Sequence, residues 1–127
     1  MKYTFTAVFK REGNKVFARV PDLDGCITSG KTIEDAIDQM TDAMNAWLVV
    51  AEDENLPIPN PTEQDNIEHE KGDVLSVIKA DTMQYRAKTD TKTVRKNVSL
   101  PAFLFNFADK RHINCSQVLQ DALMAMF

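Results

Sequence analysis

Side chains that could do acid–base or metal chemistry are few in this chain of 127 residues, and they are scattered. Asp22 and Asp24 flank a PDLDG turn, where aspartates usually hydrogen-bond to their own backbone. His69 and His112 are far apart, and neither has a serine or cysteine partner at the spacing of a catalytic motif. We therefore expect no enzymatic activity. A divergent metal-dependent nuclease that uses the two aspartates is the one catalytic alternative.

Metal and cofactor binding are not indicated by the remaining residues. Cys26 and Cys115 are too isolated for a disulfide framework, and the sequence has no CxxC pair or His–Cys cluster. Its four glycines include no glycine-rich phosphate loop. The sequence therefore predicts no metal and no cofactor.

The stretch KTVRKNVSL, residues 92–100, offers recognition chemistry instead, because its alternation predicts a strand with two different faces. One face carries Val94, Lys96, Val98 and Leu100, and the other carries Thr93, Arg95, Asn97 and Ser99. In the DNA major groove, arginine pairs with guanine and asparagine with adenine through paired hydrogen bonds. An outward arginine and asparagine are also typical of a solvated strand face, so this stretch alone leaves both interpretations open.

A second contact to nucleic acid is predicted where the last helix begins. Asn114 is a helix-capping residue, and Gln117 stands at the capping-box position. The amides of Cys115 and Ser116 would then be free donors at the positive end of a helix dipole, which suits a phosphate group.

These residues lie in a segment, 92–127, that is too small to fold by itself. It comprises one strand, a helix opened by Pro101 at its first position, and a second short helix. A lone strand has no hydrogen-bonding neighbour, and Phe103 and Phe105 add apolar surface that one copy cannot hide. The segment therefore predicts a homodimer in which two strands pair antiparallel across a two-fold axis and fit a DNA major groove.

Residues 1–80 are predicted to form a small α+β layer. Strands are expected at 2–10, 15–20, 26–30 and 73–80 because of their alternation and β-branched content. The last of them is nearly all apolar, which is typical of a strand covered on both faces. Thr32 caps a helix whose apolar stripe would pack on the sheet. Residues 62–71 are expected to be a mobile surface segment, and residues 81–91 a linker.

The charge is divided unevenly between the two parts. Residues 1–91 carry 10 basic and 17 acidic residues, a net charge of −7, whereas residues 92–127 carry 5 and 2, a net charge of +3. This asymmetry favours nucleic acid as the partner of the C-terminal part and a basic partner for the N-terminal part. With no membrane-length apolar run and no signal-like N-terminus, we expect a cytoplasmic protein.

The chain resembles two known modules in a known order. The stretches VRKNVSLP and INCSQVLQDAL resemble a ribbon-helix-helix DNA-binding domain, and PDLDGCITSG and KTIEDAIDQM resemble the N-terminal domain of HicB-type antitoxins. Asp24 replaces the second proline of the usual turn, and His112 replaces the usual glycine between the two C-terminal helices.

The resemblance implies a partial RNase H-like domain at residues 1–80, a linker at 81–91 and a ribbon-helix-helix dimerisation module at 92–127. It also implies a HicA-type toxin, a small basic ribonuclease, as partner, and operator DNA bound for autorepression, with Thr93, Arg95 and Asn97 as base readers. The PDLDG turn, with Asp22, Leu23 and Asp24, is expected to touch the toxin because it is exposed and acidic. Two dimers could join into a tetramer. A ribbon-helix-helix repressor whose N-terminal domain senses a ligand, without a toxin, is the second alternative.

Overall fold

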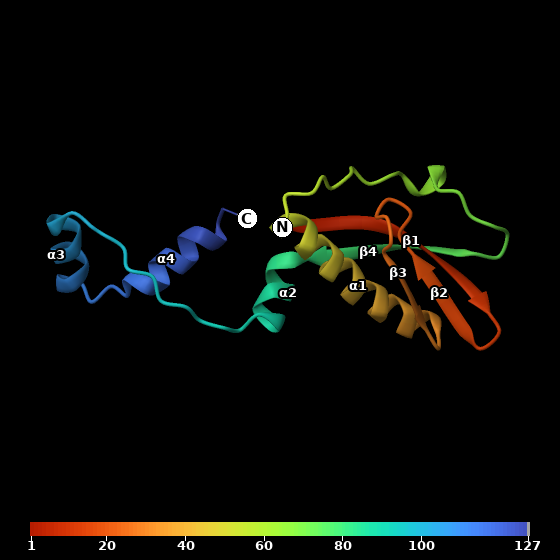
Figure 1. Ribbon diagram of the computed structural model, residues 1–127, viewed down its shortest axis with the longest axis horizontal. Helices are drawn as coiled ribbons and strands as arrows, with labels where there is room; N and C mark the ends of the chain where they lie inside the picture. Colours follow the sequence, from red (N-terminus) through yellow and green to blue (C-terminus); the bar gives the residue numbers. More distant parts are fainter. Residues whose placement is uncertain (127) are drawn as a thin grey trace. The chain divides into compact units, whose positions relative to one another are not determined.

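The computed structural model describes residues 1–126 of the chain (Figure 1). It divides into two compact units, an N-terminal unit (Met1–Arg86) and a C-terminal unit (Ala87–Phe127). Helix α2 (Thr82–Thr89) crosses this boundary, so the segment predicted as a linker contains a helix. Phe127, the last residue of the predicted dimerisation module, lies outside the described residues.

The N-terminal unit is built on an antiparallel sheet with the strand order β3-β2-β1-β4. The strands are β1 (Lys2–Glu12), β2 (Lys15–Arg19), β3 (Ile27–Gly30) and β4 (Val74–Asp81). Strands β1 and β2 form the predicted hairpin, with Val8 opposite Arg19 and with a turn at Gly13, whose φ of 58° suits glycine. Strand β4 returns along the other edge of β1, with Phe5 opposite Ile78.

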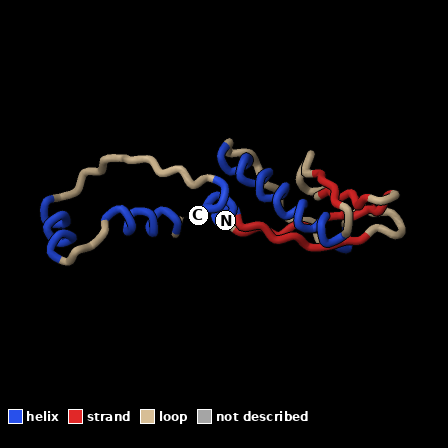
Figure 2. The backbone as a smooth tube through the Cα atoms, turned by 90° about the horizontal axis from the view of Figure 1, so that it is seen from below, coloured by secondary structure: helices blue, strands red, loops and turns tan. Residues whose placement is uncertain are grey.

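Helix α1 (Ile33–Asp53) lies against one face of this sheet (Figures 1 and 2). Thr32 caps it as predicted, because its hydroxyl accepts from the Asp35 amide at 3.1 Å. The predicted stripe is buried at Met40, Met44 and Leu48. These side chains form one core with the inward side chains of the sheet, among them Phe5, Phe9, Val16, Ala18, Ile78 and Ala80.

Strand β4 is not covered on both faces, contrary to the prediction. Ile78 and Ala80 belong to the core, but Val74 and Val77 are 41% and 47% exposed. The strand lies at the edge of the sheet, where helix α1 covers one face only. A continuous apolar run therefore did not distinguish an edge strand from a central one.

Residues 62–71 lie mostly on the surface, as predicted, and make side-chain contacts with the sheet. A short 3-10 helix (Gln64–Asn66) is followed by the buried side chain of Ile67. Lys10 Nζ lies 2.8 Å from a carboxylate oxygen of Glu70, and the Arg19 guanidinium donates to the Glu68 carbonyl at 3.3 Å.

The C-terminal unit contains helices α3 (Ala102–Lys110) and α4 (Cys115–Met124). Pro101 is the N-cap of α3 and not its first helical residue. Residues 90–100 form no regular element, so the single chain does not contain the predicted strand. A strand of this kind has no ladder to join without a second copy. Among residues 1–126, no helix is long and apolar enough to cross a membrane.

Candidate protein-binding and nucleic-acid-binding surfaces

The PDLDG turn is only partly the exposed acidic loop that the sequence predicts. Leu23 is 1% exposed and belongs to the core, so its side chain is unavailable to a partner. The turn is closed by backbone hydrogen bonds from Leu23 to the Val20 carbonyl and from Cys26 to the Leu23 carbonyl. Of the three residues predicted to touch a toxin, Asp24 is exposed, whereas Asp22 is partly buried.

The sequence predicts that Asp22 bonds to the backbone of its own turn. In the structure it bonds instead to the distant proline-rich loop. Its carboxylate accepts from the Thr62 amide at 2.8 Å and from the Thr62 hydroxyl at 2.6 Å. The Asp24 carbonyl accepts from the indole nitrogen of Trp47 at 2.9 Å. The turn therefore connects the sheet, helix α1 and the loop that follows it.

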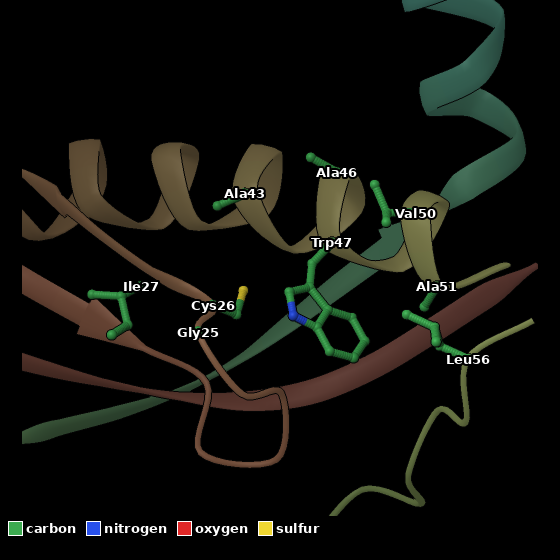
Figure 3. Close-up of a pocket in the computed structure, with 9 residues that line it drawn as sticks. All are labelled: Gly25, Cys26, Ile27, Ala43, Ala46, Trp47, Val50, Ala51 and Leu56. Carbon is green, nitrogen blue, oxygen red and sulfur yellow. The ribbon is translucent and has the colours of Figure 1, made fainter. Parts of the chain in front are cut away.

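Beside this turn, an apolar groove of about 500 Å³ opens between helix α1 and the start of strand β3 (Figure 3). We call it the α1–β3 groove, and its lining contains no charged side chain: Gly25, Cys26, Ile27, Ala43, Ala46, Trp47, Val50, Ala51 and Leu56. Ile27 and Val50 are 66% and 51% exposed, and Leu56 is exposed as well. Sequence reasoning missed this surface; the one signal was Val50, an apolar residue outside the buried stripe of α1.

Helix α1 also gives the N-terminal unit a strongly acidic surface. Its 21 residues include no lysine or arginine. They include six carboxylates, at Glu34, Asp35, Asp38, Asp42, Glu52 and Asp53. Asp38 and Asp42 are exposed, whereas Asp35 accepts from the Lys31 amide at 2.9 Å. An uninterrupted set of like charges on one helix attracts a basic surface.

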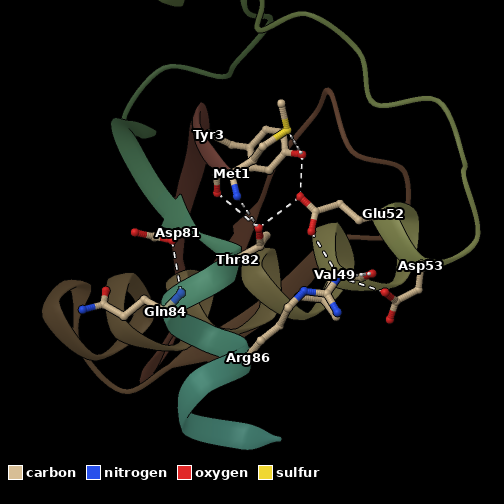
Figure 4. A network of polar contacts seen from close by, with 9 residues as sticks. All are labelled: Met1, Tyr3, Val49, Glu52, Asp53, Asp81, Thr82, Gln84 and Arg86. Carbon is tan, nitrogen blue, oxygen red and sulfur yellow. Dashed lines mark hydrogen bonds and ion pairs between the residues drawn. The ribbon is translucent and has the colours of Figure 1, made fainter. Parts of the chain in front are cut away.

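A polar network joins the end of α1 to the start of α2 (Figure 4). The Glu52 carboxylate accepts from the hydroxyls of Tyr3 at 2.7 Å and of the fully buried Thr82 at 3.0 Å. The Arg86 guanidinium lies 3.1 Å from Glu52 and 2.9 Å from Asp53. The Thr82 amide donates to the Met1 carbonyl, so the network also fixes the start of strand β1. No pattern in the sequence predicts these contacts, because the residues are far apart along the chain.

This network changes the proton affinity of its members. Burial, together with the Glu52 carboxylate as hydrogen-bond acceptor, raises the pKa of Tyr3 to about 12. Burial opposes ionisation of Glu52, but hydrogen bonds from Tyr3, Arg86 and Thr82 outweigh it and lower the pKa of that carboxyl. The Glu52 carboxylate is therefore charged, with its two oxygens occupied.

The C-terminal unit has no core of its own. No residue between 87 and 126 is buried. Thirteen large apolar side chains are exposed there: Val94, Val98, Leu100, Phe103, Leu104, Phe105, Phe107, Ile113, Val118, Leu119, Leu123, Met124 and Met126. So much exposed apolar surface on some 40 residues is far more than a folded monomer normally leaves open.

The residues predicted to read DNA bases, Thr93, Arg95 and Asn97, are all exposed in the irregular stretch before α3. Because this stretch is not part of a sheet in the single chain, no ladder of backbone hydrogen bonds fixes the three side chains on a common face. They remain a prediction that depends on pairing with a second copy.

The turn between α3 and α4 forms without the usual glycine. The Ile113 amide donates to the Ala108 carbonyl at 2.9 Å and the His112 amide to the Asp109 carbonyl at 3.2 Å, a Schellman motif. His112 takes the left-handed conformation, with a φ of 54°. The histidine thus occupies the glycine position at some cost in backbone strain.

Helix α4 begins as predicted, with the Asn114 side chain accepting from the Gln117 amide at 3.2 Å. The Gln117 side chain does not complete a capping box, because it donates forward to Asp121 at 2.9 Å. The first-turn amides of Cys115 and Ser116 have no earlier helical carbonyl to bond. Asn114, Cys115 and Ser116 thus lie together at one helix start.

Metal ligands and reactive thiols do not form a site in the described residues. Among residues 1–126, no group of three or more His, Cys, Asp or Glu side chains is arranged to hold a metal ion. Cys26 is buried, which raises the pKa of its thiol to about 11, and Cys115 is exposed and free.

Several solved structures have a similar fold. A toxin–antitoxin complex from Streptococcus pneumoniae matches with a TM-score of 0.63 and 16% identity, covering 100% of both chains. The antitoxin HicB of Burkholderia pseudomallei matches with a TM-score of 0.55 and 23% identity, covering 97% of this chain and 95% of that one. A HicA3 and HicB3 toxin–antitoxin complex matches with a TM-score of 0.52 and 19% identity, covering 62% of this chain and 99% of that one.

Sequence comparison finds a phage relative and a family profile that matches most of the chain. A protein from the rep–hol intergenic region of Haemophilus phage HP1, with a mass of 14.9 kDa, is 29% identical over 94 residues, which is 72% of this chain and 68% of the phage protein. The profile of the HicB-like antitoxins of bacterial toxin–antitoxin systems matches residues 5–123, which span both units. The chain therefore belongs to the HicB-like antitoxin family.

Proposed function

We propose that this antitoxin neutralises a HicA-type ribonuclease through its N-terminal unit and binds operator DNA through a dimer of its C-terminal unit. The observation that carries the proposal is the match of the antitoxin profile across both units, at residues 5–123. Similar folds in a toxin–antitoxin complex and in a HicA3 and HicB3 complex support a toxin partner. Such a protein would act in the cytoplasm, on its own operon.

The dimer is proposed because a single chain leaves the C-terminal unit uncovered. Helices α3 and α4 expose apolar residues that include Phe103, Phe107 and Leu119. A second copy related by a two-fold axis would cover these residues and supply the missing neighbour for residues 92–100. The result would be a ribbon-helix-helix module.

DNA recognition would then use both sets of residues from the C-terminal unit. A paired ribbon would direct Thr93, Arg95 and Asn97 to base edges in the major groove. The start of α4, with Asn114, Cys115 and Ser116, would contact phosphate through backbone amides and the helix dipole. Base reading and phosphate binding would thus come from different elements of one dimer.

The test separates the two activities of the full chain. We expect the double substitution R95A/N97A to abolish operator binding in a gel-shift assay while neutralisation of the toxin in a ribonuclease assay is unchanged. K92A serves as the matched control for the loss of one nearby positive charge, and it should bind the operator within about threefold of wild type. Loss of both activities in R95A/N97A would contradict this division.

A ligand-sensing repressor without a toxin is a second candidate, because the N-terminal unit has the 500 Å³ α1–β3 groove. Ligand pockets usually combine an apolar lining with a few convergent polar groups. The side chains that line this groove offer two polar hydrogens, on the Trp47 indole and the Cys26 thiol. The Asp24 carbonyl already accepts the first, and the Met40 sulfur accepts the second. We therefore favour a protein partner for the N-terminal unit.

A further inference from the structure

We propose that the α1–β3 groove receives an apolar side chain of a basic protein partner. The acidic stripe of α1, formed by Asp35, Asp38 and Asp42, would bind basic residues of the partner around that side chain. This inference rests on the function proposed above, under which the partner is the toxin. It identifies the part of the N-terminal unit that the toxin contacts.

The groove is already formed in the free chain. The Trp47 indole forms part of its wall and is fixed by its 2.9 Å hydrogen bond to the Asp24 carbonyl. Ala43 and Ala46 are small residues that line the groove on helix α1, together with the larger Trp47 and Val50 (Figure 3). A rigid apolar depression binds a partner side chain without first ordering its own residues.

The apolar side chains around the groove are exposed far beyond what folding of the N-terminal unit requires. Ile27 on β3 and Val50 on α1 leave 66% and 51% of their surface open. Leu56, from the loop after α1, adds a third exposed side chain at 47%. Together they provide an apolar centre of the kind that carries most of the binding energy of an interface.

The charge next to the groove specifies what kind of partner fits. Asp35, Asp38 and Asp42 follow each other at steps of three and four residues, so they share one face of α1. Ala46 and Val50 continue the same line at further steps of four, so the acidic stripe leads directly into the groove. Because α1 has no basic residue, this edge of the site suits lysine or arginine on the partner.

A second N-terminal unit fits the same surface poorly. Residues 1–91 carry a net charge of −7, so two copies would bring like charges together. Within the PDLDG turn, Leu23 is buried and Asp22 is bonded to Thr62, which leaves Asp24 as the exposed acidic side chain beside the groove. The turn also supports the groove by fixing Trp47.

The experiment compares two equivalent valines of the N-terminal unit. V50K places a positive charge in the groove, whereas V77K makes the same change at a valine of similar exposure, 47%, on the edge strand β4. Binding of the full-length chain to a purified HicA-type protein from the same genome is measured by calorimetry. We expect V50K to raise the Kd by about tenfold or more and V77K to change it less than about twofold.

A second pair of variants keeps the test decisive if V50K folds poorly, as checked by circular dichroism. I27T, on the opposite wall, should also weaken binding. The double variant D38N/D42N should weaken it by about threefold at low salt and by much less in about 0.5 M salt, because exposed charges are screened.

The possible outcomes distinguish failure of the proposed function from failure of the groove assignment. If the wild-type chain does not bind the HicA-type protein, the function proposed above is wrong. If wild type binds and both V50K and I27T bind equally well, the groove assignment alone is overturned. Equal losses in V50K and V77K, or a change in the sedimentation of the V50K chain by itself, would also overturn it; the second result would assign the groove to contacts between copies.

Discussion

Tyr3 is a residue whose pKa is changed by folding. Its hydroxyl donates to a charged Glu52 oxygen at 2.7 Å, and its pKa is raised to about 12. In an unfolded chain, the pKa of a tyrosine is about 10. The folded state therefore holds the Tyr3 proton at a pH where the unfolded chain has released it.

The sign of the pH effect follows from this difference. A group with a raised pKa in the folded state contributes stability that is complete below pH ~10 and is lost as the pH rises towards ~12. We expect Y3F to be less stable than wild type by ~1.5 kcal/mol near neutral pH, because a hydrogen bond to a carboxylate is lost. Between those two pH values Y3F should lose stability less steeply than wild type.

Urea unfolding followed by fluorescence of Trp47, the single tryptophan, measures both quantities. Equal alkaline slopes for Y3F and wild type would show that Tyr3 does not keep its proton in the folded chain. T82S, which retains the hydroxyl that bonds to Glu52, is the matched control and should keep the alkaline slope of wild type.

At the scale of secondary-structure elements, Gly30 sets how closely strand β3 approaches helix α1. A Cβ atom at this position would lie 2.5 Å from the Ala36 backbone nitrogen and 2.8 Å from its Cα. Both atoms belong to the first turn of α1, which Thr32 and Asp35 fix by capping bonds. The helix start therefore cannot move away without losing its cap.

We expect G30A to destabilise the N-terminal unit by ~2 kcal/mol, since added volume in a packed region strains its neighbours. The adjacent S29A, at an exposed position of the same strand, should change stability by less than ~0.5 kcal/mol. The midpoint of thermal unfolding measures the difference. A G30A chain as stable as S29A would mean that β3 and α1 can separate at little cost.

Features that depend on neighbouring residues can be predicted from the sequence, whereas contacts between distant residues cannot. The caps of α1 and α4 are local, so Thr32 and Asn114 were identified from their neighbours alone. The contact of Asp22 with Thr62 and that of Glu52 with Arg86 join residues that are distant in sequence. A periodic sequence pattern does not indicate contacts between distant residues. The contacts of the PDLDG turn with the loop after α1, and the polar network at the start of α2, therefore could not be predicted.

At the scale of the whole molecule, some features of the candidate sites can be predicted from the sequence and others cannot. The acidic stripe of α1 and the alternation of residues 92–100 are present in the sequence, and both suggest the class of partner. The α1–β3 groove depends on a turn, a helix and a loop meeting in space. The ribbon depends on a second chain, which is why the single chain leaves residues 90–100 irregular.

Operator binding by the proposed dimer should depend steeply on salt. If the dimer contacts about four to six phosphates, the slope of log affinity against log salt concentration should be roughly −4 to −5. Titrations of the operator at several salt concentrations measure this slope. A flat dependence would argue against phosphate contacts at Cys115 and Ser116.

Because the C-terminal unit has no core in a single chain, DNA binding should depend steeply on the concentration of the antitoxin. If its helices and ribbon become ordered only when two chains meet, the amount of DNA-binding form rises with the square of the chain concentration while dimers are scarce. Operator occupancy would then act as a threshold on the amount of antitoxin in the cell. A modest fall in that amount, by proteolysis of the exposed apolar segment or by dilution at growth, would release the operon disproportionately.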